Sequence, residues 1–341
     1  MTGIGVVAIG RNEGERLRSC LVSALRCAQV TVYVDSGSSD GSVELARSLG
    51  AEVVQLDMSI PFTAARARNA GLERLLELAA DVEFVQFVDG DCEIVDGWVD
   101  AATNAMRAKP RAALVCGRRR ERYPEASIYN KLCDIEWDTP GGTVKYCGGD
   151  VLARVSALRE VGGYDPSVIA GEEPEMCVRL RARGWTIERI DAEMTLHDAA
   201  MSRFGQWWKR NVRAGHAYAE GFAMHGGEPE RHRQREVSSI AVWGIVVPME
   251  MVSLTIILAV IAPRWAWIGL LPLVLYPLLF VKVLLRQRRR LRLRDAALYG
   301  AAVTLGKFPQ AIGMMKYWFG RASGKRSGVI EYKGAAVAAE K

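Results

Sequence analysis

Asp89 and Asp91, separated only by Gly90, are the residues of this sequence whose types and spacing point most directly to chemistry. They follow residues 83–88, which have the apolar pattern of a buried strand. Because glycine lets the backbone turn tightly, both carboxylates can reach one hard divalent cation, which can bridge to a diphosphate through its open positions. An isolated Asp-Gly-Asp also fits an ordinary turn with solvated carboxylates. The elements around it decide between the two interpretations.

Those elements predict a parallel sheet. Apolar, β-branched stretches alternate with stretches of helical period, which is typical of βαβ units in which helices cover the sheet. Ligands bind such sheets beyond the carboxyl ends of the strands. Polar turns stand at these ends, at residues 11–13 and 35–42 as well as at the aspartate pair. The predicted strands are 4–9, 30–34, 52–56 and 83–88, and the predicted helices are 15–27, 42–49 and 63–78.

The joint pattern resembles the family-2 glycosyltransferases, which have the GT-A nucleotide-diphospho-sugar transferase fold, over residues 4–215. The resemblance implies a Rossmann-like, mostly parallel α/β sheet with flanking helices. It also implies a nucleotide-sugar donor across the first strand ends, Mg²⁺ or Mn²⁺ on the Asp-X-Asp motif, and inversion at the sugar carbon by a carboxylate base. The motifs that carry it are Arg11-Asn12-Glu13, residues 35–42, Ala67-Arg68-Asn69-Ala70-Gly71, Val88-Asp89-Gly90-Asp91, Gly148-Gly149, Gly162-Gly163-Tyr164-Asp165, Gly171-Glu172-Glu173-Pro174-Glu175, Arg179-Leu180 and Gly184-Trp185.

Carried over by position, the resemblance assigns roles around the donor and the cation. Asp91 resembles the main metal ligand, and Asp89 resembles the residue nearest the ribose and the metal. Several GT-A enzymes take a further metal ligand from a histidine in the region that corresponds to His197, and a neutral imidazole suits Mn²⁺. A lone histidine is otherwise more often structural. The remaining donor contacts implied by the motifs are Asn12, Glu13, Asp35, Arg68, Gly149 and Arg210.

The base is expected at the start of a helix. The family usually has Glu-Asp there, with the aspartate taking the acceptor proton, and this chain has Glu172 and Glu173. Glu173, which stands where the family usually has aspartate, is the predicted base. Its side chain is one methylene longer than that of aspartate, so either the acceptor lies farther back or Glu172 takes the role, and Glu172 is the alternative. Acidic residues also favour a helix N-terminus for purely structural reasons, and Pro174 fits an early helical position.

Arg210 belongs to Gln206-Trp207-Trp208-Lys209-Arg210, which imperfectly resembles the Gln-X-X-Arg-Trp box of processive family members. Since Trp and Arg are permuted, processive polymerisation is not predicted. Lys209, Arg210 and Arg213 suit donor or lipid phosphates. An amphipathic helix on a membrane surface is an equally good interpretation of this segment.

Charge and cysteine content narrow the class of protein. The net charge of +6 is uneven, because residues 237–341 hold 15 basic and four acidic side chains while the part before them is net acidic. A basic tail favours an anionic membrane surface over a nucleic-acid partner. The seven cysteines are scattered without CxxC spacing, so a reducing compartment is expected.

Two long apolar runs predict a transmembrane hairpin over residues 238–285. The six arginines within residues 286–294 place the following segment, and with it the N-terminal domain, in the cytoplasm by the positive-inside rule. Residues 296–319 contain Lys307, Pro309 and Lys316 and are expected to be interfacial or re-entrant. The expected domains are a catalytic domain at 1–215, a polar connector at 216–237, the hairpin at 238–285, and a basic cytoplasmic segment with a tail at 286–341.

The sequence therefore predicts a multi-pass protein of the plasma (cell inner) membrane that passes a sugar to a lipid-linked or membrane-proximal acceptor in surface glycan or glycolipid synthesis. The acceptor is inferred from the hairpin, because an enzyme with a soluble acceptor gains nothing from anchoring. The alternative is a non-catalytic membrane subunit that uses a nucleotide-sugar fold for binding. A dinucleotide-dependent oxidoreductase is disfavoured because no GxGxxG turn follows the first strand.

Overall fold

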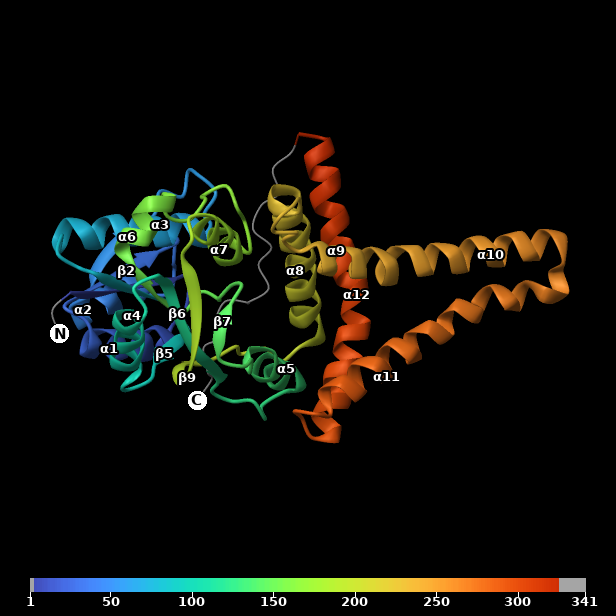
Figure 1. The fold of residues 1–341 in the computed structure, drawn as a ribbon, viewed down its shortest axis with the longest axis horizontal. Helices are drawn as coiled ribbons and strands as arrows, with labels where there is room; N and C mark the ends of the chain where they lie inside the picture. Colours follow the sequence, from blue (N-terminus) through green and yellow to red (C-terminus); the bar gives the residue numbers. More distant parts are fainter. Residues whose placement is uncertain (1–2, 325–341) are drawn as a thin grey trace. The chain divides into compact units, whose positions relative to one another are not determined.

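The computed structural model describes residues 3–324, and the chain divides into two compact units between Met201 and Ser202. The first unit is an α/β unit built on one sheet (Figure 1). Its strands are β1 (Ile4–Gly10), β2 (Val30–Asp35), β3 (Glu52–Gln55), β4 (Phe84–Asp89), β5 (Cys92–Ile94), β6 (Ala112–Glu121), β7 (Gly142–Val144), β8 (Val151–Arg154) and β9 (Thr186–His197). Its helices are α1 (Glu15–Cys27), α2 (Ser42–Leu49), α3 (Ala64–Leu78), α4 (Trp98–Ala108), α5 (Ile128–Trp137), α6 (Val155–Val161) and α7 (Glu172–Ala182).

The sheet is mixed and mostly parallel in its first half, which confirms the predicted fold class. Its order is β3-β2-β1-β4-β8-β6-β9-β5, and β7 pairs with β9. Strands β3, β2, β1 and β4 are parallel, whereas β8 runs antiparallel to β4 and to β6. The predicted strands and helices of the first ninety residues lie within a residue or two of the observed ones, because their apolar periodicity is strong.

Close packing of α3 onto the sheet depends on a glycine. A Cβ at Gly71 would lie 2.3 Å from a methyl group of Val7 and 2.9 Å from one of Val34. Thr63 caps the same helix, since its hydroxyl accepts a hydrogen bond from the Arg66 amide at 3.1 Å. The helix is therefore fixed in position directly after the β3 loop and carries Arg68 at a buried site.

Strand β9 is longer than the sequence indicates. The sequence pattern by itself indicates a strand only over residues 186–190, but β9 continues to His197 and pairs with β6, β5 and β7. The pairing of β6 with β9 contains register shifts, which bend β9. Polar residues along the second half of β9 hide the apolar pattern of a strand in the sequence. This extension places His197 opposite Glu121.

The second unit is helical. It contains α8 (Phe204–His225), α9 (Gln234–Ala241), the π-helical segment η1 (Val242–Val246), α10 (Val247–Ile261), the 3₁₀ segment η2 (Pro263–Val274), α11 (Leu275–Gln287) and α12 (Leu293–Ala322). Residue 215, the expected end of the catalytic domain, lies inside α8, and residues 216–237 are partly helical. Helix α8 continues past residue 215 because it packs closely on α12. A Cβ atom at Gly215 of α8 or at Gly313 of α12 would lie 1.9 Å from a backbone oxygen of the other helix.

Two segments of this unit, Gln234–Ile261 and Pro263–Gln287, are long and apolar enough to cross a membrane by length and composition. Each has a mean hydropathy of 2.3 over its best window, and little of either window is buried. Figure 1 shows them as the two arms of a hairpin. Residues 296–319 lie in the continuous helix α12, which accommodates Pro309. The tail from residue 325 lies outside the described residues.

Candidate active site

The carboxyl ends of three parallel strands bring the first predicted residues together. In the sheet register Gly10 pairs with Asp35, and Ile9 pairs with Asp89. The ends of β2, β1 and β4 therefore lie side by side at one edge of the sheet, as the βαβ pattern predicts.

The loops after β1 and β2 hold each other. Asn12 adopts a left-handed conformation with φ of 55°, its amide donates to the Ser38 hydroxyl at 2.9 Å, and its side-chain oxygen accepts from the Ser39 amide at 2.8 Å. One oxygen of the buried Asp35 carboxylate accepts from the amides of Gly37 and Ser38 at 3.0 and 2.9 Å. Asn12 and Asp35, two of the donor contacts that the resemblance implies, thus shape these two loops.

Glu13 lies beneath the Asp-Gly-Asp turn. It is buried and forms an ion pair with Arg16 at 3.0 Å. A Cβ at Gly90 would lie 3.1 Å from the Ile9 carbonyl oxygen and 3.2 Å from the Glu13 side chain. Glycine at position 90 is therefore what lets the turn with the two aspartates pass over the end of β1.

Arg68 connects Asp89 to the start of α7. Its guanidinium lies 2.9 Å from an Asp89 oxygen, 2.6 Å from Glu172 and 2.9 Å from Glu173. Burial alone would lower the pKa of Arg68, but the charges of these three carboxylates raise it well above the ordinary value. Arg68 therefore stays positively charged. It links Glu172 and Glu173, the two candidates for the general base, to Asp89 of the aspartate motif.

Glu173 has the electrostatics of a base. Burial, and next the charge of Glu172, raise its pKa from 4.5 to about 7, although the Arg68 cation opposes the shift. A general base works best when its pKa lies close to the working pH. Gly171, at φ of 84°, precedes α7 and directs the chain so that both glutamates start the helix.

Gly149 lies at the centre of this group. A Cβ there would lie 2.3 Å from an Arg68 nitrogen and 3.1 Å from an oxygen of both Asp89 and Glu173. The absence of a side chain at residue 149 therefore lets these three groups lie close to the backbone there and contact one another.

Asp91 and His197 face each other. The His197 Nε2 lies 3.2 Å from an Asp91 oxygen, and its Nδ1 lies 2.8 Å from Glu121. Asp91, Glu121 and His197 are all buried, and the Trp137 ring packs edge-on against the imidazole with a centroid distance of 4.7 Å. In the tautomer in which Nδ1–H donates a hydrogen bond to the Glu121 carboxylate, the Nε2 lone pair is available to a cation beside Asp91.

These donors fit a divalent cation. Asp91, His197 and Cys92 each offer an atom within 4.8 Å of the others, and Asp89, Asp150 and Cys92 form an overlapping group. Carboxylate oxygens with one imidazole suit Mn²⁺, and carboxylates alone suit Mg²⁺. Burial raises the pKa of the Cys92 thiol well above its ordinary value, which makes the oxygens and the imidazole the better donors.

The sequence argument missed Arg119, Glu121 and Asp150. Asp150 accepts a hydrogen bond from the Asp89 amide at 3.0 Å and another from the Thr195 hydroxyl at 2.7 Å. Asp150 directly follows the Gly148-Gly149 motif in the sequence, and this position could have marked it as a candidate site residue. Residues 119 and 121 share one face of β6 because side chains alternate along a strand. The sequence does not show that this face lies toward Asp89 and Asp91, because that depends on the order of the strands in the sheet.

Arg210 lies in α8, in the second unit. Its predicted contact with the donor or with a lipid phosphate stays a prediction. The other ten predicted site residues all belong to the first unit, and those from Arg68 onward gather around Asp89 and Asp91.

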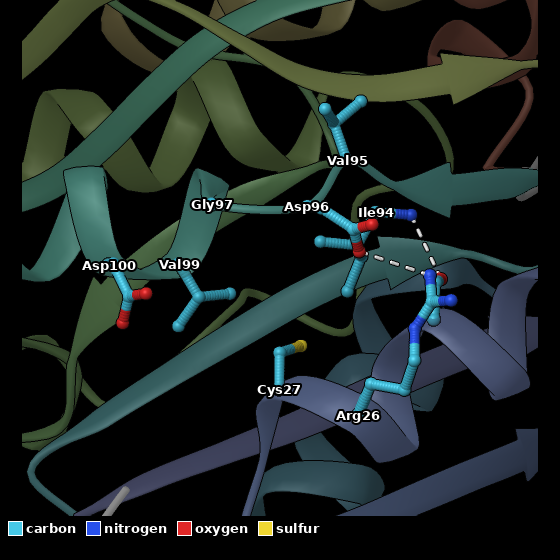
Figure 2. Close-up of a pocket in the computed structure, with 9 residues that line it drawn as sticks. Arg26, Cys27, Ile94, Val95, Asp96, Gly97, Val99 and Asp100 are labelled. Atoms are coloured by element: carbon cyan, nitrogen blue, oxygen red, sulfur yellow. Dashed lines mark hydrogen bonds and ion pairs between the residues drawn. The ribbon is translucent and has the colours of Figure 1, made fainter.

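A separate small cavity of about 120 Å³ lies between the end of α1 and the turn before α4 (Figure 2). Ser23, Cys27 and Val99 contribute to its lining, and Arg26 and Asp96 form an ion pair there at 3.2 Å. None of the predicted site residues lines it.

Comparisons with known proteins identify the first unit. Residues 6–151 match the family described as Glycosyl transferase family 2. The chain is 31% identical over 208 residues to the pre-mycofactocin glycosyltransferase of Mycobacterium tuberculosis, covering 57% of this chain and 42% of that protein. It is 22% identical over 258 residues to glycosyltransferase AglE of Haloferax volcanii, covering 71% of this chain and 80% of AglE.

One solved structure shares the fold. The mannosyltransferase PcManGT from Pyrobaculum calidifontis, solved in complex with GDP-Man and Mn²⁺, aligns with a TM-score of 0.56 at 16% identity, covering 93% of this chain and 87% of that one. The chain spans less than half the length of its mycobacterial relative. With the family match, the sheet order and the strand-end carboxylates together, the first unit, which contains the matched residues 6–151, is a family-2 glycosyltransferase domain with the GT-A fold.

Proposed function

We propose that this chain transfers a sugar from a nucleoside-diphosphate donor to an acceptor hydroxyl, with inversion at the sugar carbon. The observation that carries the proposal is the meeting of Glu173, Arg68 and Asp89 beside Gly149, where Arg68 lies 2.9 Å from both carboxylates. The predicted base, a predicted cationic donor contact and a carboxylate of the candidate cation site are thereby brought together at one place. The intact carboxylates speak against the non-catalytic alternative.

Glu173, rather than Glu172, takes the acceptor proton. The Glu172 side chain is 4% exposed and holds Arg68 at 2.6 Å, whereas the Glu173 side chain is 12% exposed. With a pKa near 7, Glu173 is partly deprotonated at neutral pH and still basic enough to remove a proton as the sugar carbon is attacked. Glu172 then acts as a positioning residue for the Arg68 guanidinium.

Asp91 and His197 are the residues that would hold Mg²⁺ or Mn²⁺, with Asp89 beside them. When bound, the cation supplies positive charge that stabilises the departing nucleoside diphosphate. Glu121 holds His197 in the orientation that presents Nε2 to the site. Arg68 adds a fixed positive charge on the side of Glu173.

The acceptor is lipid-linked or membrane-proximal, and the first unit faces the cytoplasm from the plasma (cell inner) membrane. Support comes from the two apolar segments, Gln234–Ile261 and Pro263–Gln287, and from the arginines of residues 286–294 that follow them. An enzyme whose acceptor is embedded in a membrane benefits from an anchor that holds its site near that surface.

The test is a donor screen on the full chain in detergent, with UDP-, GDP- and dTDP-sugars, Mn²⁺ and a membrane lipid extract. GDP-mannose is included because PcManGT was solved with it. We expect one donor to release its nucleoside diphosphate together with a glycosylated lipid. We expect Glu173→Gln to lose at least about 100-fold in kcat, because general-base catalysis contributes about 10²–10⁴-fold, while the donor dissociation constant stays within about twofold.

Glu160→Gln is the matched control, because Glu160 is an exposed glutamate of α6. It should turn over at the wild-type rate. Near-normal turnover by Glu173→Gln would remove the base assignment. Failure of every donor to release a nucleoside diphosphate would remove the proposed transfer reaction.

A further inference from the structure

Arg119 occupies the middle of the carboxylate cluster. From β6 its guanidinium lies 3.3 Å from an oxygen of Asp89, 3.5 Å from one of Asp150 and 3.9 Å from one of Asp91. Its side chain is 14% exposed, and the Trp137 ring lies 4.7 Å from the guanidinium carbon. Arg119 therefore pairs with the same acidic groups that are candidates to hold a divalent cation.

The contacts of Arg119 are looser than those of Arg68. Strong guanidinium–carboxylate hydrogen bonds measure about 2.7–2.9 Å, and the contacts of Arg68 to Glu172, Glu173 and Asp89 are this short or shorter. The contacts of Arg119 to its carboxylates are all longer, and its buried Nε has no hydrogen-bond partner among the described residues. Charge and the Trp137 ring hold Arg119, rather than a complete set of hydrogen bonds.

An incoming divalent cation therefore meets a positive charge already in place. Arg119 neutralises part of the negative charge that would attract the cation, and a fixed charge a few ångströms from a site changes the affinity of that site for another cation by about tenfold to a thousandfold. A nucleoside diphosphate that binds beside the cluster adds negative charge of its own and offsets this repulsion.

We propose that Arg119 is a built-in counter-ion that keeps cation affinity low until the diphosphate arrives, so that cation and donor bind cooperatively. This role rests on the proposed function for its partner ligand, but the effect on the cation alone does not. The coupling is reciprocal, because a donor that strengthens cation binding must itself be strengthened by the cation to the same degree.

The test measures Mn²⁺ binding to the full chain in detergent by electron paramagnetic resonance, without nucleotide and with GDP, UDP or dTDP. For the wild type we expect weak binding of Mn²⁺ alone and binding at least about tenfold tighter with one of the nucleotides. Arg119→Gln should bind Mn²⁺ alone about tenfold more tightly than the wild type, and the nucleotide should strengthen its binding by a smaller factor.

Two further variants separate charge from packing. Arg119→Lys keeps the charge and should bind Mn²⁺ as weakly as the wild type. Arg120→Gln is the matched control, because Arg120 is the next residue on the strand, is 49% exposed and pairs with Glu193 at 3.6 Å; it should also match the wild type.

Two results would overturn the proposal. The first is Mn²⁺ affinity in Arg119→Gln that equals or falls below the wild-type value. The second needs no variant, and so it holds even when Arg119→Gln does not fold: wild-type chain that binds Mn²⁺ equally well with and without a nucleotide that calorimetry shows to bind. If none of the three nucleotides binds, as judged by calorimetry, the proposed function fails, while the Mn²⁺ affinities of the variants still test the counter-ion role.

Discussion

Glu173 shows how a residue that departs from the usual motif keeps the chemistry. The family resemblance implies an aspartate at this position, and the glutamate is one methylene longer. In the structure the longer side chain still reaches Arg68 at 2.9 Å and lies close to Gly149. Burial and the neighbouring Glu172 raise its pKa to about 7. The environment supplies the base strength, because two adjacent buried carboxylates resist carrying charge together.

The pKa of Glu173 predicts the pH dependence of turnover. The base acts only when deprotonated, so kcat at saturating donor and Mn²⁺ should rise with pH and level off above about 7. At one pH unit below that value the rate should be about a tenth of the plateau. Initial rates between pH 5.5 and 8.5 measure this. A rate that is already constant from pH 5.5 upward would show a base with an ordinary carboxyl pKa.

The same shift predicts a stability effect with a defined sign. Because the pKa of Glu173 is raised from 4.5 to about 7 on folding, the folded chain binds more protons than the unfolded chain between these pH values. Stability therefore falls as pH rises through this window, and the loss is complete above about 7. Glu173→Gln removes the charge, so its melting temperature should exceed that of the wild type at pH 8 by about 2–4 °C.

Thermal unfolding of both proteins at pH 4.5 and pH 8 checks this sign. The difference should be near zero at pH 4.5, where the wild-type carboxyl is neutral. A melting temperature of Glu173→Gln below that of the wild type at pH 8 would mean that the Arg68 contact outweighs the burial of charge.

At the scale of elements, the loop between β7 and β8 matters as much as the helix that carries the base. It brings Gly149 against Arg68, Asp89 and Glu173, and it brings Asp150 under the Asp89 amide. Gly148 and Gly149 look equivalent in the sequence. The structure separates them, because a Cβ at Gly148 would meet nothing within 4 Å.

Gly149→Ala is therefore expected to displace the Arg68 guanidinium, since the new Cβ would lie 2.3 Å from its nitrogen. We expect a loss of about 100-fold or more in kcat/KM, because small displacements of positioning groups have effects of that size. Gly148→Ala is the matched control and should keep turnover within about twofold. Equal activity of the two variants, measured with the donor found in the screen, would contradict the role of Gly149.

At the scale of the whole molecule, a net acidic α/β unit is joined to a helical unit with a basic end. The arms of the hairpin expose many large apolar side chains, among them Val260 and Ile261, which are 77% and 72% exposed. An exposed apolar surface of this extent marks a site of membrane or protein interaction.

Removal of residues 234–287 should change how the chain is extracted from membranes. The full chain should remain in the membrane pellet in about 1 M salt and dissolve only with detergent, because apolar insertion is insensitive to screening. The variant keeps the basic residues after 287, whose attraction to lipid is screened, and should appear mostly in the salt extract. Sedimentation and immunoblotting measure both. Release of the full chain by salt alone would contradict insertion of the hairpin.

The sequence by itself determined the parallel half of the sheet, the positions of Asp89 and Asp91, and the two apolar segments. These features are local: each depends on the periodicity of a short stretch or on the order of residues at a strand end. The resemblance over residues 4–215 then selected Arg68, Glu172, Glu173 and His197 as partners of that motif.

Only the tertiary structure decided that Arg119, Glu121 and Asp150 surround the aspartates. β6 reaches the site because β8 inserts antiparallel between β4 and β6, and β9 then aligns beside β6. No local pattern encodes that order, since it is fixed by how the whole sheet buries its apolar faces. Distances then distinguish the tightly held Arg68 from the loosely held Arg119, because in the sequence both are simply positive charges.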